Sequence, residues 1–238
     1  MLSKDISFST PAENILFDDV LLHLAEQGSS PEVLRFWESS EIFIVLGRTG
    51  KWEEDVYVDC VCKENIPVLR RSSGGGTVVQ GKGCLNFTLV LSKKHHPDIP
   101  DLRKSYRFIL GKITDALALL GVPAVFKPIS DLAVVDGEKK FSGNAQHRGR
   151  NFILHHGTIL YDFDLPLIEK FLKMPRDVPE YRRNRSHLEF VTNIGLKAVV
   201  IKEAIQKIFN VRGQEHSLNA RESESLKNFL KNREVTVN

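Results

Sequence analysis

Cysteine is scarce in this 238-residue sequence, and its low count excludes two kinds of stabilised fold. Three cysteines cannot all pair with one another, so they suit no disulfide framework. Cys60 and Cys62 form a Cys-x-Cys motif, but no second Cys or His pair accompanies them at the spacing of a structural zinc site. Free cysteine is often buried, so we expect both residues to pack in the core from a helix between Glu53 and Asn65.

A membrane span, a secretion signal and a strong net charge are also missing. No apolar run reaches 18 residues, and residues 1–6 lack the charged-then-apolar layout of a signal peptide. The formal net charge of +3 is too small to indicate nucleic-acid binding. We therefore expect a cytoplasmic protein that has neither a membrane nor a nucleic acid as partner.

Three common catalytic and nucleotide-binding motifs are absent as well. A serine hydrolase would need the motif G-x-S-x-G, which does not occur. Gly76 and Gly81 have the spacing of a phosphate-binding P-loop, but Gly83 follows Lys82 where Ser or Thr is required. The dinucleotide fingerprint joins a strand to a helix, whereas the glycines here lead into a strand.

The sequence does contain a basic, glycine-rich stretch at residues 70–83, between two apolar runs that we interpret as buried strands. The consecutive glycines Gly74 to Gly76 can take positive φ and let another molecule approach the backbone closely. Their N–H groups can form an anion-binding concavity, and Arg70 and Arg71 carry forked donors suited to phosphate or carboxylate. A flexible hairpin loop with solvated arginines is the alternative.

Periodicity predicts the remaining elements. Thr10, Pro11 and Glu13 form a capping box for a first helix that Gly28 ends. Further helices are expected at 52–64, 102–120, 165–174, 198–209 and 222–231, and strands at 33–37, 42–46, 66–69, 85–91, 132–135, 140–146 and 152–160. Antiparallel strands with helices set to one side indicate an α+β fold.

Polar residues interrupt these strands at Asp131, at residues 140–146 and at residues 155–158, and we expect them to converge on a cleft. Lys140 follows a tight turn, so its ammonium can face that cleft and stabilise charge on a phosphoryl or acyl oxygen. The alternative is a surface lysine in a hairpin. His155 and His156 are strand neighbours and point to opposite faces, where one can be buried and hydrogen-bonded.

Three motifs in this order resemble those of the lipoate–protein ligases, in the biotin/lipoate protein ligase superfamily. The motifs are Arg70-Arg71-Ser72-Ser73-Gly74-Gly75-Gly76-Thr77-Val78, then Asp131-Leu132-Ala133-Val134 before Lys140-Phe141-Ser142-Gly143-Asn144-Ala145, then His155-His156-Gly157-Thr158-Ile159-Leu160. The later segments Arg185-Ser186 and Val191-Thr192-Asn193 are also similar. The resemblance covers roughly residues 10 to 210.

The resemblance implies one catalytic domain over residues 1–238, with residues 212–238 as its C-terminal helical extension. It implies mixed, mainly antiparallel sheets with packed helices. It also implies two reactions, in which lipoate and Mg-ATP give lipoyl-adenylate and pyrophosphate, and the acyl group then passes to a lysine of a lipoyl carrier. The carriers would be lipoyl domains of 2-oxoacid dehydrogenase complexes or the glycine cleavage H protein. ATP and Mg²⁺ would be reactants and lipoate a substrate, and no tightly bound prosthetic group is expected.

The resemblance further implies residue roles, with Lys140 as the catalytic residue. Its ammonium would hold the lipoate carboxyl oxygen and the phosphate, and later stabilise charge at the acyl carbon. The residues that would contact ATP or the adenylate are Arg71, Gly75, Gly76, Thr77, Val78, Val79, Asp131 and Lys140, and those that would contact lipoate are Arg71, Lys140, Gly143 and His156.

Several questions stay open. Many two-step ligases continue into a small C-terminal domain, so a separate accessory protein is a further expected partner. The turn Gly47-Arg48-Thr49-Gly50 lacks the glutamine that commonly follows Gly-Arg in these ligases.

An ATP-independent octanoyl or lipoyl transferase would need a reactive cysteine, and only Cys84 is near the loop, where we expect it to pack. A non-catalytic module for an acyl-adenylate or a carrier is a further hypothesis, and a biotin–protein ligase is another. Arg182, Arg183 and Arg185 are either a docking surface for acidic carriers or a solvated basic turn.

Overall fold

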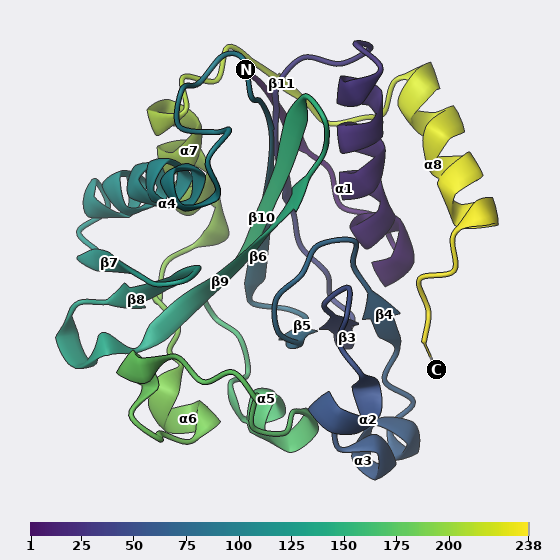
Figure 1. Cartoon of the computed structure of the whole chain (residues 1–238). Helices are drawn as coiled ribbons and strands as arrows, with labels where there is room; N and C mark the ends of the chain where they lie inside the picture. Colours follow the sequence, from purple (N-terminus) through teal and green to yellow (C-terminus); the bar gives the residue numbers. More distant parts are fainter. Residues whose placement is uncertain (238) are drawn as a thin grey trace.

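The computed structural model describes residues 1–237, which form two sheets with helices packed around them (Figure 1). The strands are β1 (Leu2–Asp5), β2 (Val33–Trp37), β3 (Phe43–Leu46), β4 (Val68–Arg70), β5 (Val78–Gln80), β6 (Cys84–Ser92), β7 (Ala124–Lys127), β8 (Asp131–Val134), β9 (Lys140–Arg148), β10 (Phe152–Leu160) and β11 (Gly213–Glu215). The helices are α1 (Pro11–Glu26), α2 (Trp52–Asp55), α3 (Val58–Lys63), α4 (Leu102–Ala118), α5 (Pro166–Phe171), α6 (His187–Phe190), α7 (Ala198–Ile208) and α8 (Ala220–Asn232), with short 3-10 turns η1 (Asp136–Glu138) and η2 (Glu180–Arg182).

The large sheet has eight strands in the order β11-β1-β2-β6-β10-β9-β8-β7. β1 runs parallel to β2 and β11, and every other neighbouring pair in this sheet is antiparallel. The small sheet has the order β4-β3-β5, in which β3 is parallel to β4 and antiparallel to β5. The expected α+β class with mixed, mainly antiparallel sheets is confirmed.

Helices cover both faces of the large sheet, so the expectation that they are set to one side is wrong. α4 and α7 pack on one face, and α1 with α8 packs on the other (Figure 1). Strand alternation explains the division, because Leu34 and Phe36 of β2 join the core under α4 and α7 while Val33 joins the core under α1. Since the sheet is buried on both faces, every residue of β6 is buried, and the strand reads as an almost continuous apolar run.

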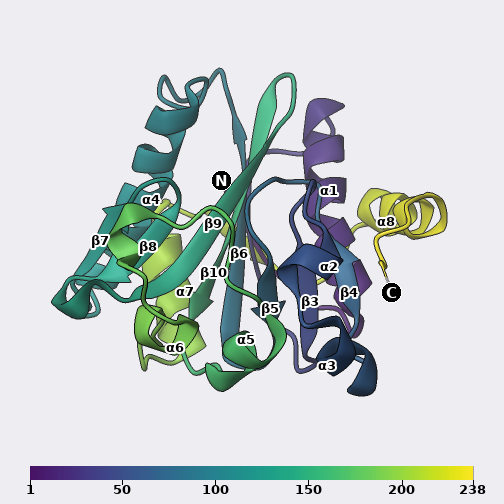
Figure 2. The same cartoon turned by 60° about the horizontal axis from the view of Figure 1, so that its bottom comes forward.

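The small sheet has a separate core, formed with α2, α3 and α5 (Figure 2). Ile44, Val61 and Phe171 are fully buried members of this cluster. The strands expected at 33–37 and 42–46 both form, but β2 lies in the large sheet and β3 in the small one. The intervening turn therefore connects the two sheets instead of closing a hairpin.

The predicted cap of the first helix is confirmed. The Thr10 side chain accepts a hydrogen bond from the Glu13 N–H, Glu13 reaches back to the Thr10 N–H, and Pro11 begins the helix. Gly28 follows the end of α1 with a φ of +71°. This cap fixes the first residue of α1. It therefore also fixes the position of the acidic residues on the face of α1 that packs against the sheet.

The helix predicted at 52–64 is wrong in one respect, because it is two short helices with a break at Val56 and Tyr57. Val56 is fully buried and forms an isolated bridge with Leu172, which takes it out of helical geometry. The prediction that Cys60 and Cys62 pack in the core is also wrong. Both are exposed on α3, where Val61 alone turns inward.

Residues 212–237 contribute β11, which pairs with β1, and α8, which packs against α1. Beyond α8 the chain meets the small sheet, where the Arg70 N–H donates to the Val235 carbonyl (2.8 Å) and the Val237 N–H donates to the Val68 carbonyl (2.8 Å). The tail thereby adds hydrogen bonds along the free edge of β4. Across residues 1–237, no helix is both long and apolar enough to cross a membrane.

Candidate active site

Residues 71–77 form a loop that leads from β4 to β5, and we call it the glycine loop. β4 and β5 flank β3 on opposite sides and do not pair with each other, so the loop crosses the end of β3 and is not a hairpin turn. Gly47 follows β3, and a Cβ atom added there would lie 2.0 Å from the Gly75 carbonyl oxygen. Gly75 itself has a φ of +89°. Both positions require glycine for the loop to lie this close.

Arg71 lies beneath the glycine loop with 8% of its surface exposed. Its Nη2 donates to the carbonyls of Gly74 (2.6 Å) and Gly76 (2.8 Å), and its Nη1 donates to the carbonyl of Val45 (3.3 Å). Burial lowers the pKa of the guanidinium from 12.5 to about 10, which leaves it charged at neutral pH. The predicted anion ligand is thus also the residue that holds the loop.

Arg70, in contrast, uses one side of its guanidinium for contacts within the chain. Its Nη1 donates to the carbonyls of Gly47 (3.0 Å) and Gly50 (2.7 Å), so the side chain closes the turn that follows β3. The turn is also joined to the glycine loop, because the Arg48 N–H donates to the Ser73 carbonyl (2.8 Å).

The backbone N–H groups of the glycine loop are unused. Within residues 1–237, no hydrogen bond is donated by the N–H groups from Ser72 to Thr77. Unpaired N–H groups in consecutive peptides can bind an anion, so the anion-binding role of this stretch stays a prediction. Val78 and Val79 lie differently, because they begin β5 and pair with Val45 and Ile44 of β3.

Lys140 begins β9, directly after the turn that closes the β8–β9 hairpin. Its Nζ lies 2.7 Å from Oδ1 of Asp131, the first residue of β8. The lysine side chain is 29% exposed and the aspartate side chain 10% exposed, so the pair is partly accessible to solvent. A Cβ atom added to Gly143 would lie 3.1 Å from the Lys140 Nζ, so a side chain at this position would crowd the ammonium.

Tyr181 completes this arrangement from η2. Its hydroxyl donates to Oδ2 of Asp131 (2.8 Å), so the two carboxylate oxygens are divided between the phenol and the ammonium. Burial and the charge of Asp131 raise the pKa of Tyr181, which keeps the hydroxyl protonated as a donor. The backbone also holds Lys140, since its carbonyl accepts the Thr192 N–H (2.9 Å).

Arg182, Arg183 and Arg185 do not form a solvated basic turn. Arg182 is 3% exposed, and its guanidinium stacks 4.7 Å from the Phe190 ring. Arg185 donates to the carbonyls of Gly137 (2.9 Å) and Tyr181 (2.8 Å), which ties η2 to the β8–β9 turn. Only Arg183 is largely exposed. Two of the three arginines therefore support the segment that carries Tyr181.

His155 and His156 point to opposite faces, as strand geometry predicted. His155 is fully buried and close to Phe87 and Tyr106, and burial lowers its pKa from 6.5 to about 3. His156 faces the glycine loop, where its Nε2 lies 2.6 Å from Ser73 Oγ. His155 is thus a neutral core residue, while His156 belongs to the site.

The glycine loop and the Lys140–Asp131 pair lie in one region. A Cβ atom on Gly75 would be 3.8 Å from Cβ of Ala145, a residue of the same strand as Lys140. Tyr106 of α4 interacts electrostatically with both Arg71 and Asp131, and burial raises the pKa of its phenol to about 12. The two halves predicted from separate motifs are therefore brought together by the β9–β10 hairpin and α4.

Sequence reasoning missed three residues of this region. Asp18 is fully buried on α1 and contacts His156, Tyr181 binds Asp131, and Tyr106 faces both halves. Asp18 left one signal, because an acidic residue on the buried face of an apolar helix requires a partner. Tyr181 and Tyr106 had no signal, since neither belongs to one of the motifs.

Cys84 is fully buried, as expected for a packing residue. Burial raises the pKa of its thiol to about 12, which disfavours the thiolate that a nucleophile needs. Among residues 1–237, no group of three or more His, Cys, Asp or Glu side chains is arranged to hold a metal ion.

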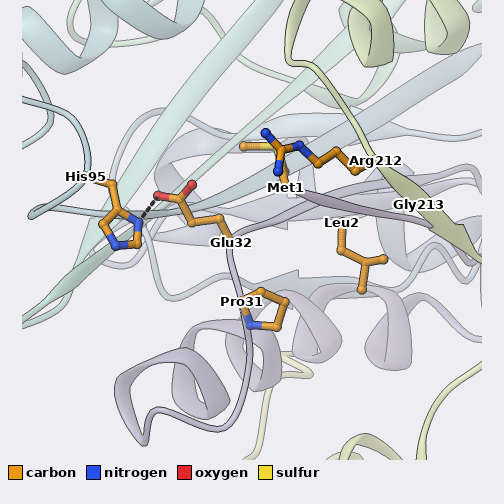
Figure 3. Close-up of a pocket in the computed structure, with 7 residues that line it drawn as sticks. All are labelled: Met1, Leu2, Pro31, Glu32, His95, Arg212 and Gly213. Atoms are coloured by element: carbon orange, nitrogen blue, oxygen red, sulfur yellow. Dashed lines mark hydrogen bonds and ion pairs between the residues drawn. The ribbon is translucent and has the colours of Figure 1, made fainter.

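A surface pocket of about 450 Å³ lies elsewhere, between the N-terminus and the turn after β6 (Figure 3). Glu32 and His95 face each other in it at 3.3 Å, and Arg212 lines the other side. None of the predicted site residues lines this pocket.

A family comparison identifies most of the chain. The model of the lipoyl protein ligase A/B catalytic domain matches residues 10–211. Residues 212–238 lie outside the matched range.

Curated relatives carry two different activities in their names. The chain is 31% identical over 166 residues to a probable lipoate-protein ligase A of Mycoplasma pneumoniae, a match that covers 70% of this chain and 47% of that protein. It is 26% identical over 240 residues to the octanoyltransferase LipM of Geobacillus kaustophilus, which covers 90% of this chain and 85% of that protein. The chain thus spans about half the length of the first relative but most of the second.

Solved structures share the fold. The bi-partite lipoate protein ligase of Thermoplasma acidophilum, described with its E2 lipoyl domain, superposes with a TM-score of 0.81 at 23% identity, covering 98% of this chain and 94% of that one. A lipoate-protein ligase A bound with ATP also gives 0.81, at 22% identity and with 97% and 94% coverage. From the family match over residues 10–211, the chain belongs to the lipoyl protein ligase A/B catalytic domain family.

Proposed function

We propose that this chain is an ATP-dependent lipoate–protein ligase, which makes lipoyl-adenylate and transfers the lipoyl group to a lysine of a lipoyl carrier domain. The observation that carries the proposal is the placement of the Lys140 ammonium, fixed by Asp131, beside a loop with unused backbone N–H groups. Family membership and the likeness to a ligase that binds ATP support it.

Lys140 can act in both steps because an ammonium has three N–H donors. One is directed at Asp131, and the others remain for the lipoate carboxylate and the α-phosphate. Holding both groups on one cation would align the carboxylate oxygen for attack on the phosphorus and release pyrophosphate. In the second step the same cation would stabilise the negative charge that develops on the acyl oxygen.

The remaining predicted residues fill the positions around this cation. Arg71, Asp131 and the backbone of Gly75, Gly76, Thr77, Val78 and Val79 are proposed for the nucleotide. Arg71, Gly143 and His156 are proposed for lipoate, together with Lys140. Mg²⁺ would arrive with ATP as part of the substrate. Residues 1–238 are proposed as a single catalytic domain, with residues 212–238 as its C-terminal extension and the cytoplasm as its location.

The proposed carrier is a lipoyl domain of a 2-oxoacid dehydrogenase complex or a glycine cleavage H protein. The likeness to a ligase that was solved with its E2 lipoyl domain supports this choice. A separate accessory protein is proposed as a further partner for adenylation, because one structural neighbour is described as bi-partite.

The test incubates the purified chain with lipoate, Mg-ATP and an apo lipoyl domain, and measures the mass of the domain and release of pyrophosphate. Both should appear. Transfer from preformed lipoyl-adenylate, without any reaction from ATP, would restrict the chain to the second step. Failure with both donors would refute the proposal.

An octanoyltransferase is a second candidate function, since the LipM relative is covered over 85% of its length. Such an enzyme would take an octanoyl thioester without ATP, and the buried Cys84 is poorly suited as its nucleophile. Transfer from an octanoyl thioester that persists in Cys84→Ser would exclude this thiol. Transfer that disappears in Cys84→Ser, with Lys140 dispensable, would favour the thioester mechanism over ours.

A further inference from the structure

A serine of the glycine loop, a histidine and an aspartate form a line of contacts that leads from the loop into the core. Ser73 Oγ lies 2.6 Å from His156 Nε2, and His156 Nδ1 lies 3.4 Å from Asp18 Oδ2. The three residues come from the glycine loop, β10 and α1, so only the folded chain assembles them. Their order is that of a nucleophile, a base and an orienting carboxylate.

The hydrogen bonds around Ser73 assign a direction to this chain of contacts. Arg71 Nε–H donates to Ser73 Oγ (3.0 Å), so the serine hydroxyl proton remains for His156 Nε2. Because the Asp18 carboxylate can only accept, we assign a proton to His156 Nδ1, which leaves Nε2 as the acceptor of the serine hydroxyl. The hydrogen bonds therefore run from the Arg71 guanidinium to the Asp18 carboxylate through one serine and one imidazole.

Asp18 is a fixed end for these hydrogen bonds. Its Oδ1 binds Arg35 Nη1 (2.6 Å) and its Oδ2 accepts the Thr88 hydroxyl (2.8 Å), and all three residues are buried. Burial by itself would raise the pKa of Asp18, but the charge of Arg35 and the hydrogen bonds from His156 and Arg35 lower it overall. The carboxylate thus stays ionised and anchored between α1, β2 and β6.

Ser73 is poorly placed to be a nucleophile. It is 1% exposed, and its hydroxyl is enclosed between the Arg71 guanidinium and the His156 ring. A nucleophile needs an open approach for the carbonyl that it attacks, and this hydroxyl has none. The geometry points to a role in holding Arg71.

Arg71 in turn determines where the loop peptides point. Its Nη2 draws the carbonyls of Gly74 and Gly76 inward. In a planar trans peptide the N–H of the next residue is directed opposite to the carbonyl. The N–H groups of Gly75 and Thr77 are therefore turned away from Arg71, and neither has a partner within residues 1–237.

We propose that Ser73, His156 and Asp18 are positioning residues, which hold Arg71 from the core so that the loop N–H groups face an incoming phosphate. The activity part of this inference rests on the proposed ligase function. Its structural part, the hydrogen-bond direction, does not depend on any activity.

The first experiment is a double-mutant cycle on adenylate formation with Ser73→Ala and Arg71→Lys. Because Ser73 acts through Arg71, Ser73→Ala should lower kcat/KM for ATP about tenfold in the wild-type background and less than threefold in Arg71→Lys. Ser105→Ala is the matched control, since Ser105 is buried and accepts a hydrogen bond from Arg148 outside the site, and it should change activity less than twofold. Equal losses in both backgrounds would overturn the inference.

A conservative pair on His156 separates positioning from simple packing. His156→Gln keeps an acceptor near the position of Nε2, whereas His156→Asn keeps only a donor near the position of Nδ1. We expect His156→Gln to retain several-fold more kcat/KM for ATP than His156→Asn, with equal melting temperatures. The reverse order, or a lipoyl group found covalently attached to Ser73 by mass spectrometry, would contradict the role assigned here.

The second experiment needs no activity. Nitrogen-15 NMR of histidine side chains in the wild-type protein should show His156 protonated on Nδ1, and Ser73→Ala should shift the Nε2 resonance. A ring protonated on Nε2 would overturn the inference. If the wild-type protein formed no adenylate, the proposed function would fail, while the tautomer would still decide whether the hydrogen bonds run in the stated direction.

Discussion

The two cationic halves of the site are held in opposite ways. Arg71 is nearly buried, and its guanidinium is bound by three carbonyls and one hydroxyl. Lys140 is 29% exposed, and its ammonium has a single carboxylate partner at 2.7 Å. A guanidinium suits the first task because its donors form a rigid fork, and an ammonium on a flexible stem suits the second.

The difference separates a half whose cation is fully bound by the protein, the Arg71 half, from a half whose cation keeps free donors, the Lys140 half. The glycine loop is held by hydrogen bonds within the protein, so under the proposed function its N–H groups would need little reorganisation to bind a phosphate. Lys140 keeps donors free for groups that move during the reaction. Changes in the Lys140 half should therefore affect the chemical steps, and changes in the loop half should affect both binding and stability.

The largest expected effect is that of Lys140→Ala, which removes the cation proposed to stabilise both steps. Adenylate formation should fall by about 10³-fold, the upper range for losing one preorganised charge-stabilising group. Unfolding by urea should be nearly unchanged, because the lysine is partly exposed. Lys139→Ala, at the exposed neighbouring position, should retain activity. Full activity of Lys140→Ala would refute the proposed mechanism, but it would not affect the family membership.

Gly47→Ala tests the Arg71 half. The new Cβ would stand 2.0 Å from the Gly75 carbonyl oxygen, so the loop must shift. We expect about a 100-fold loss of kcat/KM for ATP, since small misplacements of binding groups have effects of this size. Overpacking should also cost about 2 kcal/mol of unfolding free energy.

Gly111→Ala is the control for that change. Gly111 lies inside α4, and an added Cβ there would meet nothing within 4 Å. It should raise the unfolding free energy by roughly 0.5–1 kcal/mol and leave activity unchanged. A Gly47→Ala protein as stable and active as the wild type would show that the close approach to Gly75 is not needed.

Tyr181→Phe should have a smaller effect, and it acts on the Lys140 half. Removing the hydroxyl leaves Asp131 Oδ2 without its donor, so the carboxylate holds Lys140 less precisely in one place. We expect about a fivefold loss of kcat, the value of one hydrogen bond of about 1 kcal/mol. Tyr161→Phe is the matched control, because Tyr161 donates to Glu38 away from the site. Equal losses in the two variants would contradict a role through Asp131.

The smallest effect concerns His155, the histidine that faces away from the loop. Its pKa is lowered from 6.5 to about 3 in the folded chain, so the unfolded chain binds more protons between these values. The stability that depends on neutral His155 is present above about pH 6.5 and is lost as the pH falls towards 3, by on the order of 1 kcal/mol per pH unit.

A comparison with His155→Gln checks this slope. The variant should be less stable at neutral pH, because it loses the packing against Phe87, but its unfolding free energy should fall less steeply below about pH 6.5. Parallel curves for the two proteins would show that His155 is protonated in the fold.

Much of the fold was predictable from local patterns. The capping box at Thr10, the apolar run of β6 and the Asp136–Gly137 turn each specify their element through interactions between near neighbours. The short strands β1, β5, β7 and β11 were not predicted, because three or four residues stabilise a strand only through the partner strand. Trp52–Lys63 was mispredicted as one helix, since the bridge from Val56 to Leu172 is a tertiary contact.

By itself the sequence determined the chemistry available, which is a glycine loop with arginines, a lysine after a tight turn and two strand histidines on opposite faces. Only the tertiary structure decided how these groups are used. It turned Arg70 inward to close a turn, and it set Ser73 between Arg71 and His156. It also gave Asp131 the second partner Tyr181. The reason is physical, because a buried polar side chain must find its partner wherever folding places one, and the partners here come from segments far apart in the chain.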